Sequence, residues 1–319
     1  MSGTAVPASA DTGGDTRTAD TTGSTQTTGS TETGGSTETG GSTQTTGSTD
    51  TSGGIRAQVK RRLAARVGSR PGEGATVLIY HRVGGGSPDE LDVTTAAFTA
   101  QADLLAELPP GRVVSLDEAV DRIEADRRTP STVLTFDDGF ADVYENAWPL
   151  LRERSLPFTV YLASGHIGGE MRWEGSTAKT AGAPALSWEQ LREMTDSGLC
   201  TVANHTRSHA RPELLSTAEL DACNDDVEQH LGLRPRHYAY TWGVPVPHME
   251  PALRARFRTA ATGEVGRNTP GFDPVRLCRV PVRRTDPIEF YRAKLYGRLI
   301  PERTYARIVA TAKAVGARA

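Results

Sequence analysis

From Ala75 onward, short apolar runs alternate with longer amphipathic segments, and this alternation limits the fold more than any other feature. The runs have the length and the β-branched or aromatic content of buried strands, whereas the longer segments are typical of helices. We expect strands at 75–80, 132–136, 158–163, 201–204, 237–243, 258–262 and 277–282. Strands that alternate with helices indicate a parallel sheet with helical crossovers. The expected fold class is α/β, a distorted or incomplete (β/α) barrel of parallel strands with outer helices.

Helix starts are marked by capping boxes, in which a serine precedes a Glu or Gln by three residues. Three such boxes begin at Ser115, Ser187 and Ser216. We expect helices to follow each of them, and further helices at 98–108, 141–154, 250–257 and 302–315.

Residues 1–54 differ in composition from the rest of the chain. They contain almost no large apolar side chain, and from Gly23 they repeat a hexad of Gly, Ser and Thr with an occasional Gln, Glu or Asp. Such a segment cannot bury enough surface to offset the entropy lost on ordering, so we expect a disordered tail. A solubilising spacer is the simplest role, and an O-glycosylated or partner-binding segment is the alternative.

Residues 55–74 predict a basic amphipathic helix or linker between the tail and a catalytic domain at 75–319. Ile55, Val59, Leu63 and Val67 recur every four residues, and six basic residues follow Gly54 without an intervening acid. We expect this helix to pack on the outside of the domain, while peripheral membrane contact of the segment 55–70 with anionic lipid is the alternative. Nothing beyond this cluster suggests nucleic-acid binding.

The remaining composition excludes several classes of protein. Cys200, Cys223 and Cys278 are widely spaced and form no CxxC pair, so neither a disulfide framework nor a sulfur metal site is predicted. No signal peptide and no transmembrane segment can be recognised, and we expect a cytoplasmic location by default.

The run 133–139, Val-Leu-Thr-Phe-Asp-Asp-Gly, has two adjacent acids just before its final glycine. Asp137 and Asp138 would repel each other unless water or a cation stabilises them. Downstream, His205 and His209 are four residues apart, so both rings can face one point. One carboxylate and two imidazoles make a metal-binding set with open coordination positions, suited to Zn²⁺, Co²⁺, Ni²⁺ or Fe²⁺.

These residues fall where parallel strands end. The expected strands place Asp137, Asp138, His205, His81 and Trp242 at carboxyl ends, which lie together at one edge of such a sheet. We therefore expect them to form one site.

The motifs resemble those of the polysaccharide deacetylases, carbohydrate esterase family 4, also called the nodulation-type chitooligosaccharide deacetylase domain. The resemblance lies in Thr-Phe-Asp-Asp-Gly at 135–139 and His-Thr-Arg-Ser-His at 205–209, with Tyr-His-Arg-Val at 80–83 similar to one branch of the family. It covers roughly residues 75–290 and leaves the tail out.

The resemblance implies a role for each matching residue. Asp138, His205 and His209 would hold one divalent metal, most simply Zn²⁺, and Asp137 would be the general base acting on water that the metal activates. A backbone N–H near Tyr240 would stabilise the oxyanion. Trp242, beside that loop, is a candidate substrate contact.

The sequence departs from the family pattern in two places. One is the third family motif, at 238–243, which usually offers an arginine and a proline before an aromatic residue; the other is the late histidine that usually serves as general acid. Thr241 stands where a proline is expected and no matching arginine precedes it; no histidine follows His248. We expect His81 to be the general acid, with His166 as the second candidate.

The expected function is a metal-dependent hydrolase that removes N-acetyl groups from an amino sugar in a polysaccharide, an oligosaccharide or a smaller glycoside. Its expected partner is this N-acetylated glycan. The alternatives are a non-catalytic sugar-binding relative and a hydrolase of a formyl or cyclic amide in a small metabolite.

Overall fold

The computed structural model describes residues 51–66, 68, 71–176, 178 and 183–316 of the chain. Most of the tail expected to be disordered, residues 1–50, lies outside this range. Helix α1 (Thr51–Ala64) begins before the expected boundary at residue 55. No helix in the described ranges is both long enough and apolar enough to cross a bilayer.

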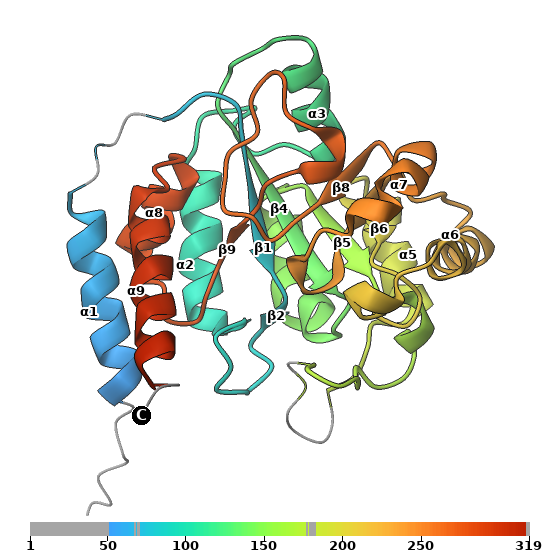
Figure 1. Ribbon diagram of the computed structural model, residues 1–319, viewed down its shortest axis with the longest axis horizontal. Helices are drawn as coiled ribbons and strands as arrows, with labels where there is room; N and C mark the ends of the chain where they lie inside the picture. Colours follow the sequence, from blue (N-terminus) through green and yellow to red (C-terminus); the bar gives the residue numbers. More distant parts are fainter. Residues whose placement is uncertain (1–50, 67, 69–70, 177, 179–182, 317–319) are drawn as a thin grey trace, which may run out of the picture. The chain divides into compact units, whose positions relative to one another are not determined.

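The domain is built on a seven-stranded sheet in the order β8-β7-β6-β5-β4-β1-β9, and every pairing within it is parallel (Figure 1). Its strands are β1 (Ala75–Tyr80), β4 (Ser131–Asp138), β5 (Phe158–Leu162), β6 (Cys200–Asn204), β7 (His237–Ala239), β8 (Thr259–Ala261) and β9 (Val280–Pro281). The short strands β2 (Arg82–Val83) and β3 (Asp92–Val93) pair separately. This architecture confirms the expected α/β class.

The sheet curves toward a barrel, but within the described residues no continuous ladder of hydrogen bonds joins its two edge strands. One isolated parallel bridge joins Ala261 of β8 to Leu277, in the segment that continues into β9. Because β9 also pairs with β1, this bridge links the two edges of the sheet. The result is the incomplete (β/α) barrel expected from the sequence.

The helices cover the sheet between successive strands. They are α2 (Thr95–Ala106), α3 (Leu116–Glu124), α4 (Trp148–Glu153), α5 (Trp188–Asp196), α6 (Thr217–Leu231), α7 (Glu250–Arg256), α8 (Ile288–Leu295) and α9 (Ile300–Gly316). Ser115, Ser187 and Ser216 each accept a hydrogen bond from the backbone three residues on, as expected for caps. Helix α8 was not predicted.

Alternation along the strands separates two apolar faces. Tyr80, Phe136 and Phe158 point toward the helices, where they form a cluster with α2, α5 and α8. The alternate residues form a second cluster shared by strands from β1 to β8, and it includes Val77, Val133, Tyr161, Ala203, Ala239 and Ala261. Asp137 continues the alternation of Val133 and therefore points to this inner face.

The expected strand at 237–243 is too long. Strand β7 ends at Ala239, and a 3₁₀ turn follows at Thr241–Gly243. Trp242 and Gly243 have φ angles of 54° and 68°, and two successive left-handed residues cannot continue a strand. The expected strand at 277–282 is likewise shorter, because only Val280 and Pro281 are assigned to β9.

Candidate active site

Asp138, His205 and His209 form a buried cluster at the carboxyl ends of β4 and β6. The Nε2 atoms of His205 and His209 lie 3.4 and 3.3 Å from Oδ1 of Asp138. All three potential ligand atoms lie within 4.8 Å of one another. The structure thus brings together the three residues that the sequence predicts as metal ligands.

An unusual backbone conformation positions these side chains. Six non-glycine residues of the described part have a positive φ, and four of them belong to this region: Asp138, Thr206, His209 and Trp242. At Asp138 a φ of 77°, followed by 105° at Gly139, ends the strand alternation. Non-glycine residues adopt such angles at a cost, which the surrounding contacts must offset.

Asn204 supplies several of those contacts. Its amide oxygen accepts a hydrogen bond of 2.8 Å from the backbone N–H of Thr206, and its Nδ2 donates to the carbonyl of Leu220. Oγ1 of Thr206 then accepts from the backbone N–H of Ala210 at 2.9 Å. These bonds hold the turn that presents both histidines.

The ring of His205 is oriented for a ligand. Its Nδ1 donates to the carbonyl oxygen of Ala239 at 2.9 Å, which leaves Nε2 to face Asp138, where it donates to the carboxylate when protonated and can bind a metal when neutral. Burial alone would raise the pKa of Asp138, but its hydrogen bonds to His205 and His209 hold that pKa well below the usual range. With both Nε2 atoms deprotonated, the two imidazoles and the ionised carboxylate form a buried donor set that fits a divalent cation.

Asp137 is bound by Arg279. The two guanidinium NH groups donate to the two carboxylate oxygens at 2.6 and 2.8 Å. Both side chains are buried, and burial alone would raise the pKa of Asp137; the charge of Arg279 lowers it instead. Asp137 is therefore ionised, with lone pairs left to accept a further proton or hydrogen bond.

Arg279 is the residue that the sequence interpretation missed. No arginine precedes Tyr238 in the third motif, as noted from the sequence, but Arg279 reaches Asp137 from the segment before β9. A charged residue inside the apolar run 277–282 was the available signal, because a buried arginine requires a carboxylate partner.

The cluster opens into a cavity of about 270 Å³. His81 lines this cavity beside Asp137 and Asp138, and its Nδ1 is buried without a hydrogen-bond partner among the described residues. His166, the second candidate acid, lies outside the lining and approaches the carbonyl oxygen of Ser208 at 3.4 Å. The geometry places His81, rather than His166, next to the two carboxylates.

Two tryptophans border the cavity and contact His209. The ring of Trp173 stacks on His209 at 4.3 Å, and Trp242 meets it edge to face at 4.4 Å. Trp242 is 43% exposed, which leaves part of its ring available to a ligand. The fixed ring of His209 is thus held from two sides.

The backbone N–H of Tyr240, the residue near which an oxyanion donor was expected, already has a partner within the sheet. This N–H donates to the carbonyl oxygen of Ala261 at 2.9 Å, and the buried ring of Tyr240 is absent from the cavity lining. The N–H is occupied because Tyr240 still extends the pairing between β7 and β8. A donor near Tyr240 was expected from the motif, but the N–H of Tyr240 itself is not free.

A family model described as polysaccharide deacetylase matches residues 124–254, which contain both motifs. Among solved structures, IcaB from Ammonifex degensii is 29% identical with a TM-score of 0.58, and the match covers 71% of this chain and 98% of that one. Over residues 124–254 the chain is therefore similar to the polysaccharide deacetylase family. The Streptococcus pyogenes deacetylase PplD, solved with acetate, shares the fold at 20% identity with a TM-score of 0.57, over 70% of this chain and 98% of that one.

Curated relatives match over shorter stretches. The putative polysaccharide deacetylase YxkH of Bacillus subtilis is 25% identical over 135 residues, 42% of each chain. The poly-beta-1,6-N-acetyl-D-glucosamine N-deacetylase of Staphylococcus aureus is 32% identical over 76 residues, 24% of this chain and 23% of that one. The chain therefore spans less than half the length of either relative, while its Asp-His-His group lies in the part that the family model matches.

Proposed function

We propose that the protein is a metal-dependent hydrolase that removes N-acetyl groups from the amino sugars of a glycan. One observation carries the proposal: an ionised Asp137, held by Arg279, lies directly beside a buried Asp138, His205 and His209 group in a single cavity. A family likeness alone would not specify a reaction. A paired base and metal-binding group is the chemistry that amide hydrolysis needs.

Asp137 is the general base. The carboxylate takes a proton from water as the water oxygen attacks the acetyl carbonyl carbon. The two hydrogen bonds from Arg279 fix its orientation, so the remaining lone pairs point into the cavity rather than rotate away. A divalent cation held by Asp138, His205 and His209 would act as a Lewis acid and lower the pKa of water. Zn²⁺ is the first candidate, with Co²⁺, Ni²⁺ or Fe²⁺ as alternatives.

His81 is the general acid. It lines the cavity directly after the end of β1, the strand next to β4, and it gives a proton to the amine nitrogen as the C–N bond breaks and acetate leaves. Trp242 contacts the sugar, because an exposed ring beside the cavity offers an apolar face to the C–H groups of a pyranose.

The name of one relative supports the substrate class that we propose. The Staphylococcus aureus relative acts, by its name, on poly-β-1,6-N-acetyl-D-glucosamine. An N-acetylglucosamine chain or oligomer is therefore the substrate that we propose first, ahead of a small glycoside.

The test is acetate release from β-1,4- and β-1,6-linked N-acetylglucosamine oligomers and from small N-acetylated glycosides. Metal-stripped protein is assayed alone and with each of the four divalent metals, beside Asp137→Asn. Asp121→Asn is the matched control, because this exposed carboxylate on α3 lies outside the cavity lining.

We expect metal-dependent acetate release that Asp137→Asn reduces by at least about a hundredfold and Asp121→Asn leaves unchanged. Oligomer binding without acetate release from any substrate would refute the proposal in favour of a sugar-binding protein. Release of formate or ring opening in a small amide, without acetate release, would assign the site to a different hydrolase.

A further inference from the structure

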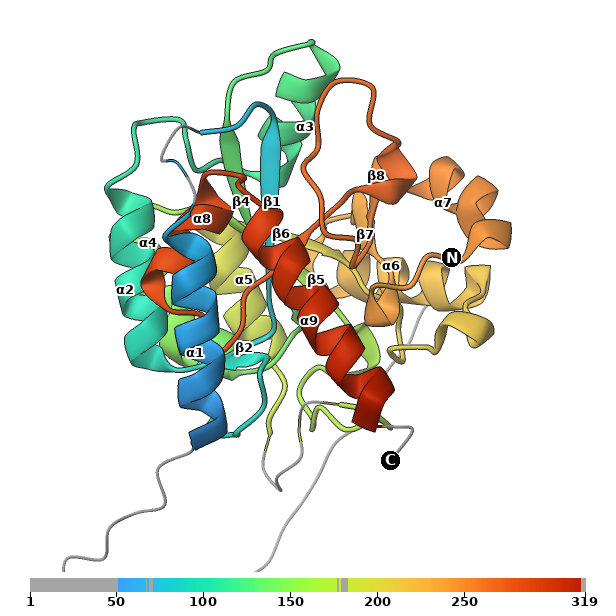
Figure 2. The same cartoon turned by 60° about the vertical axis from the view of Figure 1, so that its left-hand side comes forward.

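The N-terminal helix packs into a three-helix layer beside the edge strand β9. Figures 1 and 2 show α1, α8 and α9 side by side, and Val59 and Leu63 of α1 pack against Phe290 of α8 and Tyr305 of α9. Two of the four residues of the apolar stripe predicted at 55–67 therefore face the domain, while Ile55 is exposed and Val67 lies outside the described residues. Any contact of this layer with a partner uses its outer face.

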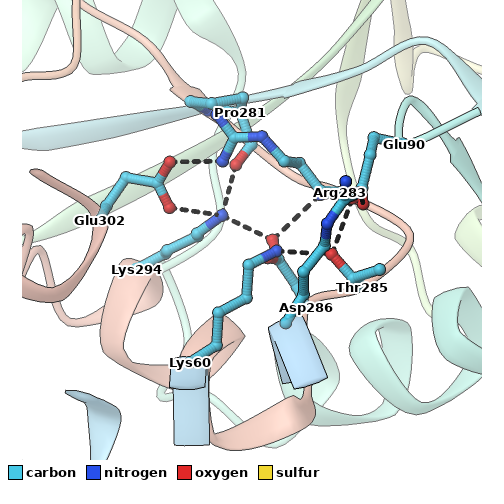
Figure 3. A network of polar contacts seen from close by, with 9 residues as sticks. Lys60, Glu90, Pro281, Arg283, Thr285, Asp286, Lys294 and Glu302 are labelled. Carbon is cyan, nitrogen blue, oxygen red and sulfur yellow. Dashed lines mark hydrogen bonds and ion pairs between the residues drawn. The ribbon is translucent and has the colours of Figure 1, made fainter. Parts of the chain in front are cut away.

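A buried ionic network locks the three helices together (Figure 3). Nζ of Lys60 contacts Asp286 at 2.7 Å, and Nζ of Lys294 contacts Asp286 at 2.5 Å and Glu302 at 3.0 Å. Arg283 adds an ion pair with Glu302. Asp286 and Glu302 thus pair with three cations: Lys60 of α1, Lys294 of α8, and Arg283, which precedes α8. The network joins α1, α8 and α9 into one layer, and both of its acids are engaged inside that layer.

The outer face of this layer is strongly basic. Within the described side chains, its exposed charged residues are Arg56, Arg61, Arg62, Arg66, Arg292, Arg303 and Arg307, against the single acid Glu289. Arg62, Arg66 and Arg292 have no carboxylate partner in the described part of the chain, and the contact of Arg61 with Glu289 is long at 3.7 Å. The whole sequence carries a net charge of −3, so this concentration of arginine is local.

Exposed isoleucines lie among the arginines. Of the eight exposed large apolar residues in the described part, four belong to this layer: Ile55, Ile288, Ile300 and Ile308, exposed by 61, 37, 76 and 47%. Ile288 borders a hollow between α1 and α8, and Ile300 borders a second hollow between α1 and α9. Isolated apolar residues on a surface are common, but four isoleucines on one basic layer are not a random scatter.

We propose that the outer face of α1, α8 and α9 binds a membrane surface that contains anionic phospholipid. Arginine guanidinium groups pair with lipid phosphates, and the isoleucines enter the boundary between headgroups and acyl chains. The exposed apolar residues are aliphatic and offer no ring to stack on bases or sugars, which favours lipid over a nucleic acid or a glycan. The binding element is thus a rigid three-helix face, to which the predicted apolar stripe of α1 contributes Ile55, while Val59 and Leu63 pack inward.

This face adjoins the candidate active site at one end. Arg56 near the start of α1 pairs with Glu90 at 2.6 Å, and the next residue, Leu91, lines the cavity. Binding through the three helices therefore holds the cavity mouth beside the membrane surface.

The test is co-sedimentation of the full-length protein with vesicles of phosphatidylcholine, with and without one-third phosphatidylglycerol. Two charge-reversal proteins are compared. The first is Arg62→Glu/Arg66→Glu, at the C-terminal end of α1 and just after it. The second is Arg234→Glu/Arg236→Glu, which makes the same charge change before β7 at the other side of the sheet order. Thermal unfolding confirms that both are folded. Ile300→Ser tests the apolar contribution at raised salt.

We expect binding only to the anionic vesicles, at least about tenfold weaker for Arg62→Glu/Arg66→Glu and unchanged for Arg234→Glu/Arg236→Glu. Binding that survives 0.5 M salt should be lost in Ile300→Ser. Equal binding to both vesicle types, or no effect of the α1 reversal, overturns the proposal. Binding to soluble polyphosphate without vesicle binding overturns it in favour of an anionic polymer.

Discussion

Arg279 and Asp137 meet through two parallel hydrogen bonds, although 142 residues separate them in the chain. The pair joins the segment before β9 to the end of β4, across the inner face of the sheet. Nε of Arg279 also donates to the carbonyl oxygen of Thr262 at 3.1 Å. One guanidinium thus fixes the proposed base and ties together three segments around the site.

Arg279→Gln should lower both stability and activity. It leaves a buried Asp137 without its counter-charge, which typically reduces the free energy of unfolding by about 3–5 kcal/mol. Since Arg279 opposes the effect of burial, its loss raises the pKa of Asp137, and the acid limb of the pH profile of kcat/KM moves to higher pH.

Arg279→Lys provides the comparison, because it retains the charge but not the bidentate geometry. Its acid limb should lie between those of the wild type and Arg279→Gln. Superimposable pH profiles for all three proteins would show that Arg279 does not set the ionisation of Asp137.

Metal affinity should fall as the pH falls below neutrality. Burial alone would lower the pKa of His205, but the hydrogen bond to Asp138 raises it above its usual 6.5. Below that raised pKa the ring carries a proton that a metal must displace, so binding weakens with decreasing pH and releases a proton. Burial keeps the pKa of His209 below 6.5, so this ring adds little proton competition.

Calorimetric titration of metal-free protein with Zn²⁺, in buffers of different ionisation enthalpy, measures both affinity and proton release. His209→Ala should abolish binding at this site, whereas His166→Ala should bind as the wild type does. Affinity that is constant between pH 5.5 and 7.5 would exclude a His205 ligand.

The sequence predicted the parallel sheet and the clustering of Asp138, His205 and His209 because both depend on local signals. Strand runs end in marked residues, and parallel strands bring those ends to one edge. Arg279 could not be placed in the same way. Its partner was determined by the curl of the sheet and the bridge between Ala261 and Leu277, which no local pattern encodes.

The strand expected at 237–243 was predicted too long for a related reason. A strand was expected through Tyr240 and Trp242, but positive φ angles at Trp242 and Gly243 turn the chain into a 3₁₀ turn. Glycine signals such a turn, whereas a tryptophan with φ of 54° is rare and depends on surrounding contacts, including that with His209. The last N–H with strand pairing is therefore that of Tyr240, two residues before Trp242 in the cavity lining.

Trp242→Ala should weaken substrate binding, whereas Tyr240→Phe should not, because of these two residues only Trp242 borders the cavity. Trp242 borders the cavity, so its truncation should raise KM for oligomers by about tenfold, equivalent to one stacking contact of roughly 1–1.5 kcal/mol. Tyr240 is buried outside the lining and its hydroxyl has no partner among the described residues, so Tyr240→Phe should leave kcat and KM unchanged. Steady-state kinetics on an oligomer series measures both. Loss of activity in Tyr240→Phe would instead show that the Tyr240 hydroxyl takes part in substrate binding or catalysis.

Lys60→Met should loosen α1 from the domain. The ammonium group of Lys60 is fully buried against Asp286, and removal of one member of a buried ion pair costs about 3–5 kcal/mol. We expect the lower end of that range, because Lys294 remains to compensate Asp286. Urea unfolding measures the change, and faster trypsin cleavage at Arg61 and Arg62 reports release of the helix.

Arg61→Met is the matched control, because Arg61 is exposed and its contact with Glu289 is long. The free energy of unfolding of this variant should differ from that of the wild type by less than about 0.5 kcal/mol. Equal stability of Lys60→Met and the wild type would mean that apolar packing by Val59 and Leu63 alone holds α1 in place.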